Sequence, residues 1–334
     1  MRRAFRVRAT LALAVAAVSS ASLVSACGSS EPRNLIDSIR SGSVILGTKY
    51  DQPGLGLRHP DKKFSGFDVS VSEYVVDTIA DRLGVKHPKI TWRETPSAQR
   101  ETLIGNGEVD MIAATYSITP SRAKKVAFAG PYLVTYQGLM VRKDDTSITT
   151  LADLNRGKKL CSVTGSTPAQ NVKKQLPGVQ LQEYDSYSSC VEALQRNKVD
   201  AMTTDEMILA GFSNFDPGKF KLVGMEYAKD TCVNDTYKKA GAPFSTEYYG
   251  IGMAKDQPDT VKEVNSVLQQ MLTPATGSSV SPWSNALQKA VGAEEVNRMR
   301  ERAGSSGSKY TFTPQPGNLS FLDAPSTPCP KELS

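Results

Sequence analysis

The residues best suited to chemistry lie in one short polar segment, which follows a predicted buried strand at 109–113. This segment supplies hydroxyl side chains at Thr115, Ser117 and Thr119 and a cation at Arg122. An arginine holds a carboxylate with two parallel hydrogen bonds, and hydroxyls with free backbone N–H groups at a helix start add further donors. The pattern therefore predicts a carboxylate clamp, although an ordinary strand-to-helix loop with a solvated arginine has the same composition.

The clamp is positioned by a repeating pattern of strands and helices. Short apolar runs predict strands, and apolar residues at spacing four predict a helix that ends at Gly84. The predicted strands are 44–47, 90–92 and 109–113, and the predicted helices are 71–84 and 98–104. Strands that alternate with helices indicate a parallel sheet flanked by helices.

A second array of the same kind begins after an extended segment at 136–142. Its predicted strands lie at 160–163, 179–184 and 199–202, and its helices begin at Ala169, run through Val191 and Leu194, and begin again at Asp205. The segment 248–254 is again extended and could return the chain to the first array. Helices at 261–272 and 283–291 would then pack on that array, and 304–334, rich in Ser, Pro and Gly, would be an irregular extension.

The N-terminus has the composition of an export signal. Four arginines precede an apolar stretch at 11–18, which is too short to span a bilayer, and small residues follow. Residues 24–27, Val-Ser-Ala-Cys, resemble a bacterial lipobox in which Cys27 is lipidated, and ordinary secretory cleavage is the alternative. We therefore expect a signal peptide at 1–26, a lipidated tether at 27–34, and a protein anchored to the cell membrane on its extracytoplasmic side.

Charge and length bound the rest of the chain. There are 40 basic and 34 acidic residues, but four of the basic ones lie in the export signal, so the remainder carries a charge of only +2. A near-neutral surface without a basic stripe interleaved with aromatics argues against nucleic acid as a partner. The chain also exceeds the length of a comfortable single core, which favours two domains or lobes.

Four cysteines remain besides Cys27. Export favours disulfides, and four cysteines allow three pairings that the sequence does not decide. Cys161 lies on a predicted strand and Cys190 on a predicted helix of the same array, whereas Cys232 and Cys329 lie in a loop-like insertion and in the tail. We favour the pairs Cys161–Cys190 and Cys232–Cys329, and buried free thiols are the alternative.

Several segments that occur in this order resemble the periplasmic-type solute-binding proteins, family 3, of polar amino-acid ABC transporters: GFDVSVSEYVVDTIA, GEVDMIAATYSITPSR, FAGPYLVT, CSVTGSTPAQ, VDAMTTDE and YYGIGMAKD. The resemblance covers most of residues 43–300 and is strongest to the glutamate-binding lipoproteins of actinobacteria, whose GTKYDQPGLG and STPAQ segments are almost the same. It implies an α/β fold of two lobes, the type II periplasmic binding protein fold, which closes on its ligand about a hinge. Each lobe would be a mostly parallel sheet flanked by helices, and two crossing strands would join the lobes. The first lobe would comprise 35–138 and 250–303, and the second 139–249.

The resemblance also implies roles for single residues. Arg122 and Ser117, helped by Thr115, would bind the α-carboxylate of the ligand. Asp205 would accept hydrogen bonds from the α-ammonium, although without the resemblance a helix N-cap explains it as well. The second lobe would add the backbone N–H groups of a helix start, at Gly165, Ser166 and Thr167.

Specificity is expected to depend on Lys49, at the end of the first predicted strand. Relatives that bind basic amino acids tend to carry an acidic residue there, whereas a cation favours an acidic ligand because Coulomb attraction strengthens where water is excluded. A solvated loop charge is the alternative. Arg100, with Ser97 one helical turn before it, is the second candidate, and for Arg100 a structural salt bridge is the alternative.

Together these features predict a monomeric receptor that binds an acidic amino acid, glutamate or else aspartate, and delivers it to an ABC permease with a cytoplasmic ATPase. We expect no catalysis and no cofactor. We also expect no metal, because His59 and His87 fit no metal-ligand spacing. The alternatives are a receptor for glutamine, asparagine or other polar amino acids, a ligand sensor for a membrane kinase, and a dehydratase-like enzyme. An enzyme would need a positioned acid or base that is not already committed to binding.

Overall fold

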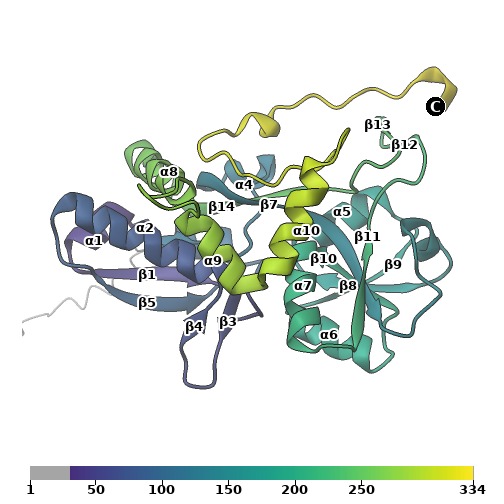
Figure 1. Cartoon of the computed structure of the whole chain (residues 1–334), viewed down its shortest axis with the longest axis horizontal. Helices are drawn as coiled ribbons and strands as arrows, with labels where there is room; N and C mark the ends of the chain where they lie inside the picture. The colour runs from purple at the N-terminus through teal and green to yellow at the C-terminus, as the bar shows by residue number, and fades with distance from the viewer. Residues whose placement is uncertain (1–30, 334) are drawn as a thin grey trace, which may run out of the picture.

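The computed structural model describes residues 31–333, which form two α/β lobes side by side (Figure 1). The predicted signal peptide and Cys27 lie outside the described residues. One sheet runs through both lobes in the order β5–β1–β6–β14–β7–β10–β8–β9, and β11 also pairs with β7. The strands of the first lobe that lie on this path are β1 (Ser43–Thr48), β5 (Lys89–Glu94) and β6 (Met111–Ile112). Strand β1 pairs in parallel with both β5 and β6, as the strand and helix pattern predicts.

Two long strands carry the chain between the lobes. The first half of β7 (Ala127–Arg142) pairs with β14 (Thr246–Met253) in the first lobe. Its second half pairs with β10 (Ala201–Asp205) and β11 (Phe220–Gly224) in the second lobe. Of the two segments predicted to be extended crossings, 136–142 lies within β7, and 248–254 overlaps β14 up to Met253. The predicted fold class, two α/β lobes joined by two crossing strands, is confirmed.

The second lobe repeats the plan of the first. Its remaining elements are β8 (Lys159–Val163), β9 (Gln180–Tyr184), η1 (Leu151–Asn155), α5 (Thr167–Gln175), α6 (Tyr187–Gln195), α7 (Glu206–Phe215), and the hairpin of β12 (Thr231–Val233) and β13 (Thr236–Lys238). Strand β8 pairs in parallel with β9 and β10. A disulfide between Cys161 on β8 and Cys190 on α6 joins a strand to the helix that covers it.

Helices of the first lobe come from both ends of the chain. They are α1 (Leu35–Arg40), α2 (Phe67–Leu83), α3 (Arg100–Gly105), α4 (Pro120–Ala123), α8 (Pro258–Leu272) and α9 (Pro282–Val291). Helix α2 ends at Gly84, whose backbone is left-handed (φ 65°), as a helix C-cap glycine requires. At the start of α1, Arg33 forms an ion pair with Asp110 at 2.9 Å, which holds the N-terminal segment on this lobe.

Besides α1, β11 and the short 3₁₀ turns, three structured segments are not anticipated by the sequence patterns. One is the small sheet of β2 (Asp51–Gln52), β3 (Gly56–Arg58) and β4 (Phe64–Ser65). The second is helix α10 (Ala293–Gly304), which packs on α9 and whose Arg302 forms an ion pair with Glu206 of α7. The third is the hairpin of β12 and β13.

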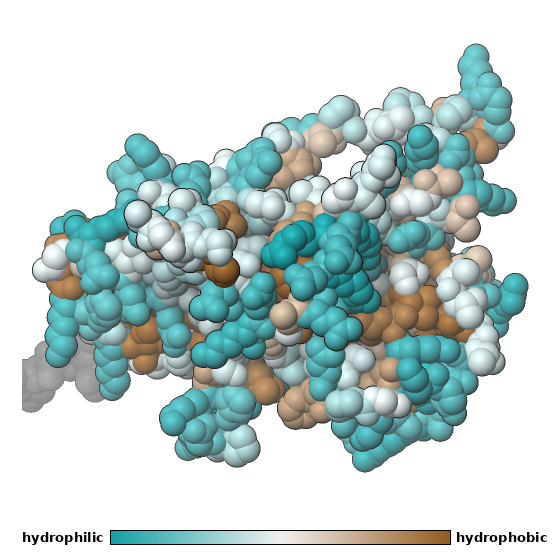
Figure 2. Space-filling view, viewed as in Figure 1, coloured by the Kyte–Doolittle hydropathy of each residue, from teal (hydrophilic) through white to brown (hydrophobic). Residues whose placement is uncertain are grey.

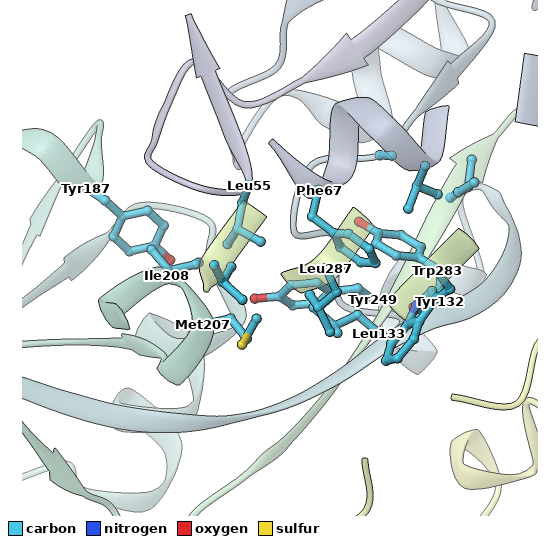
Figure 3. Packing of buried hydrophobic residues seen from close by; sticks show 14 of the residues in the cluster. Leu55, Phe67, Tyr132, Leu133, Tyr187, Met207, Ile208, Tyr249, Trp283 and Leu287 are labelled. Carbon is cyan, nitrogen blue, oxygen red and sulfur yellow. The ribbon is translucent and has the colours of Figure 1, made fainter. Parts of the chain in front are cut away.

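An aromatic core occupies the middle of the first lobe and continues toward the second (Figure 3). The ring of Phe67 lies 6.0 Å from that of Trp283 and 6.1 Å from that of Tyr132, between ring centroids. Tyr249 of β14 joins this group, and Tyr187 approaches from the second lobe. Because one apolar cluster includes residues of both lobes, the lobes are in contact through their interiors.

The chain ends in a tail, residues 305–333, which crosses both lobes (Figure 1). It contains the short turns η2 (Ser320–Leu322) and η3 (Lys331–Leu333). A disulfide between Cys329 and Cys232 attaches it to the β12–β13 hairpin. In the space-filling view the tail forms an arch whose visible side is mainly hydrophilic to neutral (Figure 2). No helix among residues 31–333 is long and apolar enough to cross a membrane.

Candidate functional site

The predicted site residues gather where the two lobes meet. They follow the carboxyl ends of parallel strands, which is where open α/β sheets bind ligands. The residues with buried side chains are Lys49, Ser97, Arg100, Thr115, Ser117, Arg122, Ser166 and Asp205. Gly165 and Thr167 are half-buried. So many buried polar groups need partners, because an unpaired polar group in the interior costs about 1–3 kcal/mol.

Arg122 reaches from the first lobe to the second. Its Nη1 donates to the Ser117 carbonyl at 2.8 Å and to the Thr167 hydroxyl at 2.9 Å. Its Nη2 donates to the Gly165 carbonyl at 3.0 Å, and its Nε lies 3.3 Å from a carboxylate oxygen of Glu101. The guanidinium is therefore aimed at the interface, and the contacts to Thr167 and Gly165 require the lobes to be close together.

The loop that begins α5 lies directly against the first lobe. A Cβ added at Gly165 would come within 2.8 Å of the Cα of Ala98, and the backbone there has φ +74°, so both space and conformation require glycine. Ser166 caps α5, since its Oγ accepts from the backbone N–H of Ala169 at 3.2 Å. The predicted helix start is therefore capped by Ser166, and at Gly165 it lies in close contact with the first lobe.

Lys49 is completely buried and is not a solvated loop charge. Its Nζ makes a long hydrogen bond of 3.5 Å to Ser97 Oγ and lies 5.7 Å from the centre of the Tyr187 ring. Burial lowers the pKa of Lys49 to about 8, partly offset by the charge of Asp51. An ammonium carries three donors, so this buried cation has capacity for a further acceptor.

Arg100 is buried too, but it binds backbone instead of the salt-bridge partner considered above. Its Nη1 donates to the carbonyls of Ala114 at 2.9 Å and Thr115 at 3.5 Å, and its Nε donates to that of Ser97 at 3.4 Å. The guanidinium lies 4.2 Å from the centre of the Tyr116 ring. Burial lowers the pKa of Arg100 to about 10. Arg100 thus holds the clamp loop in shape and brings positive charge to the interface.

The clamp loop is also held by residues that the sequence patterns do not single out. Thr115 has a left-handed backbone (φ 45°), and its N–H donates to Asp68 Oδ2 at 2.8 Å. Tyr132 donates to the other oxygen of Asp68 at 2.7 Å, and burial raises the pKa of Asp68 to about 6. The Thr115 hydroxyl donates to Gln52 Oε1 at 3.2 Å. Gln52 is fully buried, and its Nε2 has no partner within residues 31–333.

Asp205 occupies the N-cap position of α7, but its side chain makes no capping hydrogen bond, so a cap does not explain it. Its Oδ2 accepts from the hydroxyl of Tyr249, and its Oδ1 has no partner in the described part of the chain. Burial and the neighbouring Glu247 raise the pKa of Asp205 well above its usual range, while Arg122 and Arg100 act in the opposite direction. The charges of Arg122 and Arg100 on the first lobe therefore act on Asp205 of the second lobe.

One further contact joins the lobes beside this group. The carboxylate of Asp51 accepts from the backbone N–H of Ser188 at 3.1 Å and from its hydroxyl at 3.3 Å, at the start of α6. The other oxygen of Asp51 has no partner among the described residues. Asp51 and Gln52 follow Lys49 by two and three positions in the sequence. This nearness in sequence to a predicted ligand residue is the signal that could have identified them.

A family profile covers most of this two-lobed region. The profile of the bacterial extracellular solute-binding proteins, family 3, matches residues 44–278. The chain belongs to this family. Membership gives the protein a binding function outside the cytoplasm instead of a catalytic one.

Among residues 31–333, no group of three or more His, Cys, Asp or Glu side chains could hold a metal ion.

Individual members of the family show how near the likeness is. The glutamate-binding protein GluB of Corynebacterium efficiens is 52% identical over 309 residues, which cover 92% of this chain and 95% of that protein. The glutamine-binding protein of Geobacillus stearothermophilus is 33% identical over 235 residues, which cover 70% of this chain and 81% of that protein. A solved structure, an ancestral arginine-binding protein bound to glutamine, matches with a TM-score of 0.60 at 27% identity and covers 75% of this chain and 98% of its own.

Proposed function

We propose that this solute-binding protein captures an acidic L-amino acid, glutamate before aspartate, between its two lobes. The observation that carries the proposal is a set of buried polar atoms at the lobe interface with unused hydrogen-bonding capacity. The set comprises a cation, an amide donor and a carboxylate acceptor, at Lys49 Nζ, Gln52 Nε2 and Asp205 Oδ1. Orphaned buried groups in a native protein call for a missing partner. An amino acid with a second carboxylate is complementary to all three.

The two ends of the amino acid fit opposite charges. An α-carboxylate beside Arg122 would accept hydrogen bonds from the guanidinium N–H groups that now donate to Gly165 and Thr167. Ser117 and Thr115 would lie next to this carboxylate. An α-ammonium would donate to Oδ1 of Asp205, which has no partner among residues 31–333. Both contacts are charge-assisted, and such hydrogen bonds are the strong ones.

The side-chain carboxylate of the ligand fits the Lys49 end of the site. Lys49 supplies a buried positive charge, with Ser97 beside it, and Gln52 supplies an N–H donor to an acceptor-only group. A glutamine side chain would present an N–H₂ group to one of these donors. The relatives named for glutamate at 52% identity, against one named for glutamine at 33%, support the same preference.

Ligand binding is expected to favour the closed arrangement. Residues of both lobes contact one another through Arg122, Gly165 and Asp51, and a ligand between them would add contacts that exist only when the lobes are together. We further propose that the protein is attached to the cell membrane by lipid at Cys27. It would pass its ligand as a monomer to an ABC permease with a cytoplasmic ATPase.

Isothermal titration of the full chain with glutamate, aspartate, glutamine and asparagine tests the proposal. A ligand that binds only the native state also stabilises it, by about 2.7 kcal/mol when its concentration is a hundred times Kd. The unfolding temperature then rises. We expect glutamate to give the strongest binding and the largest thermal shift. Binding of glutamine in preference to glutamate would reject the acidic ligand, and binding of none of the four would reject the amino-acid site.

A further inference from the structure

The tail, residues 305–333, lies beyond the end of the family match at residue 278. Its first part is fixed to the first lobe. The ring of Phe312 is buried against Trp283 at 5.4 Å between centroids. The N–H of Gly317 donates to the carbonyl of Gly130 in β7 at 2.8 Å. The tail therefore begins as an integral part of the first lobe.

The tail then lies on both crossing strands at the point where the lobes join. The ring of Tyr310 is 4.5 Å from that of Tyr136 in β7, whose hydroxyl also bonds the backbone of Thr311. The ring of Phe321 stacks on that of Tyr248 in β14, at 3.9 Å and nearly parallel. Tyr136 and Tyr248 belong to the segments about which the lobes must rotate, so the tail contacts the hinge itself.

The last part of the tail is fixed to the second lobe. Cys329 is bonded to Cys232 in the β12–β13 hairpin. The backbone N–H of Tyr237 donates to the carbonyl of Thr327 at 2.8 Å, and Thr236 forms a bridge with Pro328. The tail thus connects the two lobes.

We propose that the tail is a strap that limits rotation of the lobes about β7 and β14. Four exposed residues, 323–326, separate the stacking of Phe321 on β14 from the contacts that Thr327, Pro328 and Cys329 make with the second lobe. A segment from Leu322 to Thr327 can span only about 17 Å when fully extended. Rotation that moves the two anchor points further apart than this span must break the stacking of Phe321 or the disulfide. All the strap's contacts are made in the arrangement with the lobes together, so the strap favours that arrangement.

The disulfide can be removed without touching the ligand site. The test variant is Cys232→Ser with Cys329→Ser, and the matched control is Cys161→Ser with Cys190→Ser, whose bond lies within the second lobe. Small-angle scattering of the ligand-free full chain measures the separation of the lobes, and hydrogen exchange measures protection of β7 and β14. We expect greater separation and faster exchange in the test variant, and wild-type separation in the control.

Glutamate dissociation, measured by stopped flow, gives a second readout that rests on the proposed function. We expect it to be at least about fivefold faster without the strap disulfide, in the range of ordinary coupling between sites. Wild-type separation, exchange and dissociation in the test variant would overturn the strap. If wild type fails to bind glutamate, the proposed function fails, while the ligand-free measurements still decide on the strap.

Mild reduction provides the same test on the unmodified sequence should a variant not fold. Cys161 and Cys190 are fully buried, whereas Cys232 and Cys329 are partly exposed, so a thiol reductant reaches the strap bond first. The variant Phe321→Ala keeps the bond and removes the stacking on Tyr248. We expect both treatments to loosen the hinge, and an unchanged lobe separation in both would contradict the proposal.

Discussion

Replacing Lys49 with methionine should reduce the preference for glutamate over glutamine. Methionine keeps much of the apolar stem and deletes the charge. Lys49 is fully buried and has a pKa of about 8, so at pH 7 roughly nine tenths of it carries the charge. A hydrogen bond to a charged group is worth about 1.5–3 kcal/mol, which corresponds to roughly 10- to 150-fold in affinity. Wild type should therefore prefer glutamate by at least about tenfold.

Titration calorimetry with both ligands and both proteins measures this as a double difference. We expect Lys49→Met to weaken glutamate binding much more than glutamine binding and to bring the two affinities within about threefold. Lys63→Met is a suitable control, because Lys63 lies in the turn between β3 and β4 and its side chain is 82% exposed. This control should keep the wild-type preference.

The pH dependence provides an independent check on the same residue. A bound carboxylate favours the charged form of Lys49, so glutamate binding raises the pKa of that ammonium. The contribution of the Lys49 charge to glutamate affinity is therefore present below about pH 8 and is lost as the pH rises above that value. Glutamate affinity should fall between pH 7 and pH 9 while glutamine affinity stays nearly constant.

Equal losses of affinity for glutamate and glutamine in the Lys49→Met variant would refute the reasoning. Selectivity would then have to be sought at Arg100.

Three further predictions concern the rest of the site and the N-terminus. Arg122→Ala and Asp205→Ala should each weaken glutamate binding by roughly 30-fold or more in calorimetric titration, because removing one member of a desolvated charge pair costs about 2–5 kcal/mol; affinities within threefold of wild type would exclude both from the site. Gln52→Leu should weaken glutamate binding by about five- to tenfold, as loss of one hydrogen bond implies, and unaltered titrations would show that its Nε2 does not face the ligand. Cys27→Ser should leave the protein in the aqueous phase of a detergent partition or unprocessed, and continued membrane attachment with cleavage at residue 27 would contradict lipid anchoring.

Elements with a strong local pattern are predictable from the sequence, and those held by distant contacts are not. Helix α2 has apolar residues at regular spacing and a glycine at its end, so its type and its last turn follow from residues 67–84 alone. Helix α10 has few apolar residues, and Val296 and Met299 are the ones it buries. It is stabilised by α9 and by the ion pair of Arg302 with Glu206, neither of which is local in sequence.

The same distinction applies to the site. The clamp residues Thr115, Ser117 and Arg122 lie within eight positions of one another, so a single pass along the chain finds them. Asp68 supports the same loop from 47 residues away, and only the fold brings its carboxylate to the N–H of Thr115. The complete burial of Lys49 is likewise invisible in a polar segment, because it depends on Ser97 and on Tyr187 of the other lobe.

The bond between Cys232 and Cys329 gives the polypeptide a third covalent route between the halves of the molecule, after β7 and β14. A protease that cut the backbone of β14 alone would therefore leave a single molecule on a non-reducing gel, because the cut lies between the two bonded cysteines, and a thiol would release the fragments. The bond closes a ring of chain whose two cysteines are separated by 97 positions, and this ring includes β14 and the helices α8 to α10. A version of this chain split within β14 would keep its two pieces joined through that bond.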